Sequence, residues 1–292
     1  MIKSDIKFYN DVTINGDIEF IKYLCSLREI NLVKGTGILG LLDECQEFLQ
    51  LGLNDEIFNA TLKPLLILHS FSDTLKILWM KRQEFGIQLS AMNTGSYDFG
   101  IIEEDKNNFK DFEFELFSAA YLNEYGLNAE LPQHTVGNDI LYKDIEIQCK
   151  HPETFTRDKI DKFLRAFQSS LQKSQKYGVL GLGLDDFMAF KEESFSIDSP
   201  QFEKNYQESL IEYDKILRNV LDDTLRFCPR VLGIYSINTH FVYNEFKFLS
   251  LSKTSNGVFC LRPNAKRVQE EIHRQAYEVI SVFNPKPAIR IL

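Results

Sequence analysis

The spacing of apolar residues divides the chain into two parts of different character. Over 39–52 and again over 60–86, apolar residues recur at intervals of three and four, which predicts helices, one in the first stretch and one or two in the second. The run that follows, 89–108, is rich in small, polar and turn-forming residues. We therefore predict a helical domain over 1–105 and a second domain over 106–292.

Beyond this boundary, helical and strand patterns alternate. We expect helices over 109–126, 156–178, 202–227 and 265–283, a hairpin over 139–150, and strands over 128–132, 179–184, 231–237 and 247–252. A helix, a hairpin, a helix and a buried strand follow each other in the order typical of an α/β/α sandwich on a mixed sheet. The predicted fold class is thus α+β or α/β, with helices before and around a central mixed sheet.

Composition narrows the class of protein. The chain has 44% hydrophobic and 26% charged residues, as folded globular proteins do, and a net charge of −9. It contains no run of about 18 apolar residues, so we expect a cytoplasmic protein without a membrane span. Its five cysteines are scattered and form no CxxC pair, which argues against a disulfide framework and a zinc site. A negative net charge does not indicate nucleic-acid binding, so the distribution of charge along the chain has to be considered.

Candidate chemistry lies in the predicted hairpin. Successive side chains of a strand point to opposite faces, so Glu146, Gln148 and Lys150 share one face while apolar residues take the other. Asp139 begins the neighbouring strand, and strands this short bring Asp139 close to Gln148 and Lys150. The alternative is an ordinary half-buried strand with a solvated polar face.

These residue types suit the hydrolysis of a phosphodiester. That reaction uses a hard divalent cation, a positioned water and stabilisation of negative charge on the phosphate. Carboxylate and carbonyl oxygens are the ligands of Mg²⁺, which takes one or two protein carboxylates and keeps several waters. A lysine beside such a site can orient the attacking water.

The chain resembles the PD-(D/E)xK nuclease superfamily, which has the restriction-endonuclease-like fold. The matching motif is Asp139, then eight intervening residues, then Gln148-x-Lys150, with Glu115 on the preceding helix. The resemblance covers roughly residues 108–250. It implies that Mg²⁺ or Mn²⁺ is bound by Asp139, Gln148, the main-chain carbonyl of Cys149 and Glu115. It also implies that Lys150 acts on the water and that these residues together are catalytic.

The departure from the common motif is Gln148, where glutamate is usual. A glutamine variant, QxK, exists in the superfamily. A neutral amide oxygen can still bind a cation, but the site loses one negative charge and should hold metal more weakly. Glu146 lies on the same face, earlier along the strand, and is a candidate for a carboxylate that supports the site without binding the metal directly.

The helix predicted after the hairpin carries a polar face beside an apolar one. Between Arg157 and Lys176 there are six basic and two acidic residues, inside an acidic protein. Four polar side chains recur at helical spacing and are our candidates for contacting nucleic-acid phosphates: Lys162, Arg165, Gln172 and Lys176. An ordinary solvated helix face would have the same pattern.

Two classes of function remain open. The first is a metal-dependent nuclease, by resemblance a DNA endonuclease of bacterial restriction or anti-phage defence. Its helical domain would bind substrate, a second copy or a protein partner, or would restrain activity. The second is a non-catalytic nuclease-like scaffold whose helical domain binds a protein partner. A nucleotide site in the GxGxxG run of 35–40 is a third reading, which the lack of a βαβ pattern disfavours. His134, before the hairpin, is a further candidate for the site.

Overall fold

The computed structural model describes residues 11–51, 55–97, 108–133, 139–152, 156–184, 215, 223–243, 249–261 and 267–291. The helix predicted over 202–227 lies almost entirely outside these residues, as does His134. The predicted domain boundary at residue 105 is outside them too. None of the helices in the described ranges has the length and apolarity needed to cross a membrane.

The N-terminal part is helical, as the periodicity predicts. It contains α1 (Asp11–Leu27), α2 (Gly37–Leu51), α3 (Asp55–Met80) and α4 (Gly86–Ala91). The second predicted stretch is a single helix, α3, which starts earlier than expected and contains Pro64 in its interior. The short helix α4 was not predicted, because it extends into a run whose composition favours turns. The GxGxxG run of 35–40 consists of a turn at 35–36 and the first residues of α2, and no strand precedes it in the described chain.

The C-terminal part is built on one mixed sheet, which confirms the predicted fold class. Its elements are α5 (Asn108–Glu124), β1 (Ile140–Tyr142), β2 (Ile145–Lys150), α6 (Arg157–Ser174), β3 (Tyr177–Gly183), the 3₁₀ turn η2 (Leu225–Phe227), β4 (Val231–Tyr243), β5 (Leu249–Leu261), α9 (Arg267–Phe283) and β6 (Ala288–Ile291). The described strands are ordered β1 to β6 across the sheet. The pairs β1–β2 and β4–β5 are antiparallel and the other three are parallel.

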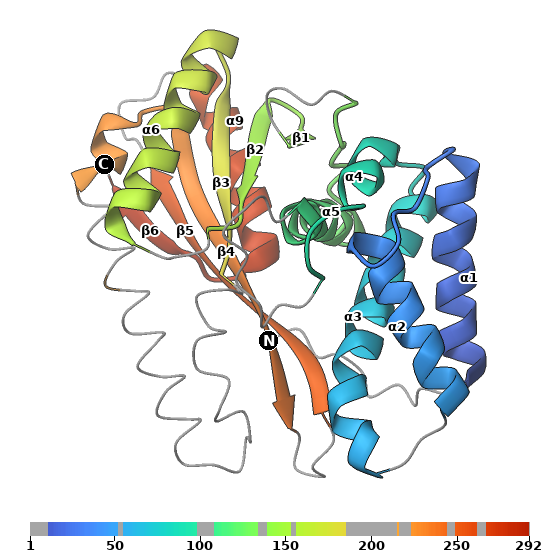
Figure 1. Cartoon of the computed structure of the whole chain (residues 1–292). Coiled ribbons are helices and arrows are strands. Elements are labelled where there is room, and N and C mark those ends of the chain that lie inside the picture. Colours follow the sequence, from blue (N-terminus) through green and yellow to red (C-terminus); the bar gives the residue numbers. More distant parts are fainter. Residues whose placement is uncertain are drawn as a thin grey trace.

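Helices cover both faces of this sheet (Figure 1). On one face, α6 packs Leu164 and Phe167 against Leu180 and Leu182 of β3. On the other face, α5 and α9 pack against the alternate residues of the strands, such as Ile147. The sheet is therefore buried on both sides, which explains why β3 reads as a continuous apolar run rather than an alternating one.

Some boundaries differ from the predicted ones for identifiable reasons. The helix expected to reach residue 178 ends at Ser174, because Gln175 adopts a left-handed conformation with φ of 59° and caps it. Strand β3 consequently begins at Tyr177, two residues early. The strand expected over 128–132 is reduced to a single bridge between Glu130 and Leu141. Strands β4 and β5 are longer than predicted, and β6 was not predicted.

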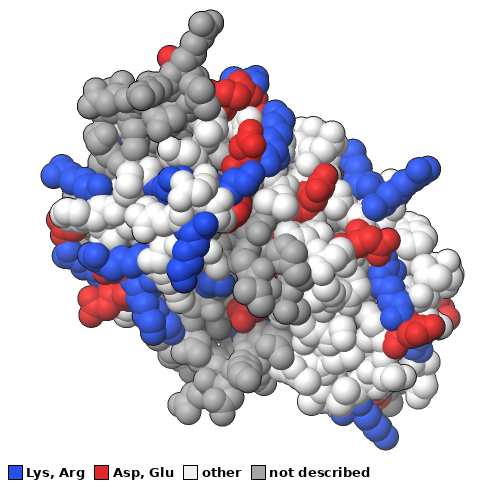
Figure 2. All heavy atoms as spheres, turned by 90° about the horizontal axis from the view of Figure 1, so that it is seen from above, with Lys and Arg blue, Asp and Glu red and all other residues white. Residues whose placement is uncertain are grey.

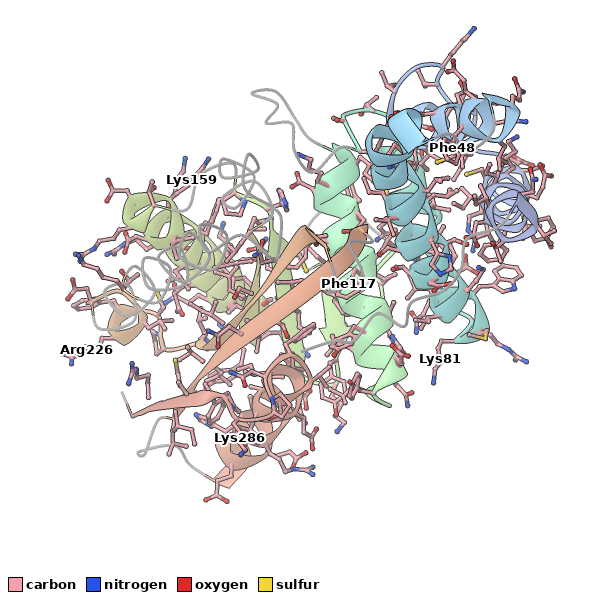
Figure 3. The ribbon with its side chains drawn as sticks, turned by 90° about the horizontal axis from the view of Figure 1, so that it is seen from below. Phe48, Lys81, Phe117, Lys159, Arg226 and Lys286 are labelled. Atoms are coloured by element: carbon pink, nitrogen blue, oxygen red, sulfur yellow. The ribbon has the colours of Figure 1, made fainter. Side chains whose placement is uncertain are left out.

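Helix α5 connects the helical part with the sheet. Its Phe109 contacts Phe71 of α3 with ring centroids 5.5 Å apart. On its other side, Lys253 of β5 lies 2.8 Å from a carboxylate oxygen of Glu113 and 4.1 Å from the ring centroid of Phe117. Figure 3 shows Phe117 on α5, where the long strands cross this helix. One buried apolar cluster thus runs through α5 from the helical part to the sheet.

Candidate active site at the ends of β1 and β2

Asp139 stands directly before β1 and is fixed by the backbone of β2. Its N–H donates to the carbonyl of Ile147 (3.1 Å), continuing the antiparallel pairing by one residue. Its Oδ2 accepts a hydrogen bond of 2.6 Å from the backbone N–H of Cys149. The carboxylate is therefore held at the end of the hairpin by main-chain atoms, independently of any neighbouring side chain.

Lys150 is the last residue of β2 and comes close to the same carboxylate. Its Nζ lies 4.0 Å from Oδ2 of Asp139, and the two side chains are 36% and 22% exposed. Both groups are thus reachable from solvent. The convergence that the sequence predicts for Asp139 and Lys150 is present in the structure.

The register of β2 on β3 sets the direction of the remaining motif residues. Gln148 and Lys150 lie opposite Leu180 and Leu182, on the face covered by α6. Gln148 is half-buried, and within the described residues its side chain makes no hydrogen bond. Cys149 points to the other face, where its Sγ lies 3.6 Å from the hydroxyl of Tyr235. A buried thiol in this position packs, so only the main chain of Cys149 remains for the site.

Glu115 reaches the site from α5 and is 7% exposed. Burial raises the pKa of its carboxyl group to about 8, and the negative charge of Asp139 adds to the rise. Lys150 and a hydrogen bond from Gln88 act in the opposite direction. The pKa of Asp139 is raised by burial as well, against the influence of Lys150 and the Cys149 N–H. The structure thus places Glu115, Asp139 and Lys150 in one electrostatic cluster.

This cluster fits a magnesium-type cation in one respect. Burial raises the pKa of both carboxyl groups, and a divalent cation beside them would lower both pKa values. Among the described residues, no three His, Cys, Asp or Glu side chains are grouped as a metal would require. Two carboxylates with amide, carbonyl and water oxygens are, however, the usual set for Mg²⁺. The donors present therefore suit Mg²⁺ and do not suit zinc.

Three of the four candidate phosphate-binding residues, Lys162, Arg165 and Gln172, lie on α6, whereas Lys176 lies beyond the left-handed cap that ends this helix and is not on its face. Two of the four have acidic neighbours. Arg165 donates to Asp161 (2.7 Å), and Lys176 lies 3.9 Å from Asp144. Lys162 and Gln172 are exposed. Figure 2 shows basic side chains gathered over the part of the molecule that carries the sheet, interspersed with acidic ones. The face is mixed in sign rather than uniformly positive.

Other polar residues near the hairpin have different places. Glu146 is buried opposite Leu141 of β1 and Gly178 of β3. The ring of His151 lies against Gly183, so close that a Cβ added there would meet it at 2.5 Å. His151 therefore points away from the face of Lys150, as strand alternation predicts.

Gln88 is the residue near this site that the sequence did not reveal. It lies in α4, is 3% exposed, and donates from Nε2 to Oε1 of Glu115 at 2.7 Å. The two residues are 27 positions apart. No motif or periodicity marks Gln88, since its role depends on how α4 packs on α5.

Comparison with known proteins gives little further information. No family model matches the chain, and no curated protein sequence matches it. Among solved structures, a chain of the CdiA-CT/CdiI toxin and immunity complex from Burkholderia pseudomallei has 14% sequence identity and a TM-score of 0.27. The match covers 51% of this chain and 89% of that chain. A similarity this low supports no inference about function.

Proposed function

We propose that this chain is a divalent-metal-dependent nuclease with DNA as its substrate. The observation that carries the proposal is the cluster of Asp139, Lys150 and Glu115 at the ends of β1 and β2. Its Asp139 is fixed by a main-chain hydrogen bond, and its Lys150 is partly exposed. Restriction or anti-phage defence is the setting that the resemblance of the motif implies.

In this proposal each residue has a distinct task. Asp139 and Glu115, with the amide oxygen of Gln148 and the carbonyl of Cys149, would hold Mg²⁺ or Mn²⁺, which supplies Lewis-acid chemistry when bound. The ammonium group of Lys150 orients the attacking water and offsets negative charge on the phosphate. Lys162, Arg165, Gln172 and Lys176 contact the nucleic-acid backbone.

A second candidate is a non-catalytic scaffold that binds a protein partner. The charges of the cluster favour this candidate. Glu115 is neutral below its raised pKa, and the negative charge of Asp139 is balanced by the positive charge of Lys150, so the cluster has no net charge even without a metal ion. Gln148 adds no charge to this balance. On this reading the site is a structural relic and the helical part carries the function.

Cleavage assays separate the two candidates. Wild type, Asp139→Asn and Lys150→Ala are incubated with supercoiled plasmid, single-stranded DNA and structured RNA in Mg²⁺ or Mn²⁺. Lys143→Ala is the matched control, because Lys143 lies at the opposite end of the same hairpin and pairs with Glu278. The nuclease proposal predicts cleavage by wild type and Lys143→Ala, inhibition by EDTA, and loss in the other two variants. If the wild type cuts no substrate and binds no Mn²⁺ in calorimetry, the nuclease proposal is wrong and the scaffold candidate remains.

A further inference from the structure

The hydrogen bond between Gln88 and Glu115 joins the helical part to the candidate active site. Both side chains are more than nine-tenths buried, and the donor–acceptor distance is 2.7 Å. The amide N–H of Gln88 holds one oxygen of the Glu115 carboxylate, from a helix that lies outside the motif.

The backbone that carries Gln88 is firmly placed. On either side of it, Phe85, Leu89 and Met92 are fully buried. The guanidinium group of Arg28 stacks over the Phe85 ring at 4.2 Å from the centroid. The carbonyl of Met92 accepts from the N–H of Ile38, at the start of α2. Thus α4 is anchored to the start of α2 and to Arg28, directly after α1, and these contacts fix the backbone that carries Gln88.

The other polar atom of the Gln88 amide, Oε1, indicates a further hydrogen-bond donor at this site. Oε1 of Gln88 is buried and has no hydrogen-bond partner among the described residues. A buried amide oxygen without a donor costs about 1–3 kcal/mol. A water of a hydrated Mg²⁺ bound at Glu115 would be such a donor. The same amide would then hold the carboxylate through one atom and the hydrated cation through the other.

We propose that Gln88 is a positioning residue of the metal site, so that the helical part completes the active site of the sheet part. This rests on the nuclease function proposed above and extends it to a residue outside the motif. Gln88 touches neither substrate nor reacting atoms and acts through Glu115 and through a water bound to the cation. Partners of metal ligands in other proteins change metal affinity or activity by about 10–100-fold when they are mutated.

The test measures Mn²⁺ binding by calorimetry and, separately, the kinetics of DNA cleavage. Gln88→Met removes both polar atoms at similar volume, and Gln88→Asn keeps the amide but shortens its reach. Gln275→Met is the control, because Gln275 is an equally buried glutamine whose Oε1 accepts from the Asp144 N–H at the other end of the hairpin. Thermal unfolding of all three variants reports any loss of stability.

The proposal predicts that both Gln88 variants bind Mn²⁺ about 10-fold more weakly and have kcat lowered by about 10–100-fold, with KM for DNA unchanged. Gln275→Met should lose stability without either effect. If wild type binds Mn²⁺ and the Gln88 variants bind it equally well, Gln88 is structural only, while the nuclease function stands. A wild type that neither binds Mn²⁺ nor cleaves DNA overturns both proposals together.

Discussion

Oδ2 of Asp139 accepts a 2.6 Å hydrogen bond from the backbone N–H of Cys149, across the end of the β1–β2 pair. This hydrogen bond means that the carboxylate also contributes to the stability of the fold, besides any catalytic role. We expect Asp139→Asn to keep the acceptor and unfold near the wild-type temperature, yet to lose Mn²⁺ binding. Asp139→Ala leaves the N–H unpaired and should lose about 1–3 kcal/mol of stability. Thermal unfolding and calorimetry check both; equal stability of the two variants would contradict this contribution to stability.

The raised pKa of Glu115 predicts a stability that depends on pH. Its pKa is about 8 in the folded chain and 4.5 ordinarily, so between these values the folded state binds more protons than the unfolded state. Without metal, stability should therefore fall as pH rises through this window. Glu115→Gln removes this contribution and should be the more stable protein at about pH 8, by a few kcal/mol. Urea unfolding of both from about pH 5 to pH 9 measures the difference, and parallel curves would refute it.

Because Glu113 and Lys253 form a buried ion pair, we expect mutations of the two residues to have non-additive effects on the free energy of unfolding. The side chains are 4% and 7% exposed and 2.8 Å apart. Either Glu113→Gln or Lys253→Met alone leaves a charge buried without its partner, which costs about 3–5 kcal/mol. The double variant should recover most of that loss. A urea-unfolding double-mutant cycle gives the coupling, and additive losses would show that the pair is not coupled.

A second charge cluster, between α1 and α3, predicts the stability of the helical part at alkaline pH. Nδ1 of His69 lies 2.8 Å from Asp17, and Nε2 lies 3.2 Å from Asp73. Hydrogen bonds to these carboxylates raise the pKa of His69 from 6.5 to about 9. The stabilisation is complete below the unfolded value and disappears as pH rises through about 9. His69→Gln should thus cost about 1–3 kcal/mol near pH 6 and less near pH 10, as measured by urea unfolding. A cost independent of pH would mean that His69 acts through packing.

The α6 face predicts a change in the salt dependence of DNA binding. Lys162→Ala should weaken binding to all sequences alike and lower the slope of log K against log salt by about 1. The loss for Arg165→Ala should be smaller, because Asp161 already holds that guanidinium group. Fluorescence anisotropy over a salt series measures both. Lys286→Ala, on the loop between α9 and β6, is the control, and an equal effect there would mean that α6 is not the binding face.

Local pattern was sufficient for much of the fold and for part of the site. Alternation in β2 placed Gln148 and Lys150 on one face, and the hairpin placed Asp139 beside them. The left-handed cap at Gln175 was not predicted, since glutamine has no preference for that conformation. Pro64 lies inside α3, where tertiary packing outweighs local preference.

What local pattern cannot give is contact between distant segments. Gln88 and Glu115 meet because α4 and α5 pack together, and Glu113 meets Lys253 from 140 residues away. A glutamine just before the turn-rich run of 89–108 and a lysine just after the strand predicted over 247–252 each suggest a solvent-facing side chain. Their burial follows from the assembly of the two parts around α5, which no spacing rule encodes.

The central position of α5 has a consequence for synthesis on the ribosome. Helices α1 to α4 leave the ribosome before α5, which supplies Phe109 to Phe71 and Glu115 to Gln88. Glu113 of α5 must then wait for Lys253, translated 140 residues later. A nascent chain interrupted between these points would have Glu115 beside Gln88 but Glu113 without its cation. A chain that ends before β5 therefore lacks Lys253, and with it the ion pair that joins β5 to the helix carrying Glu115.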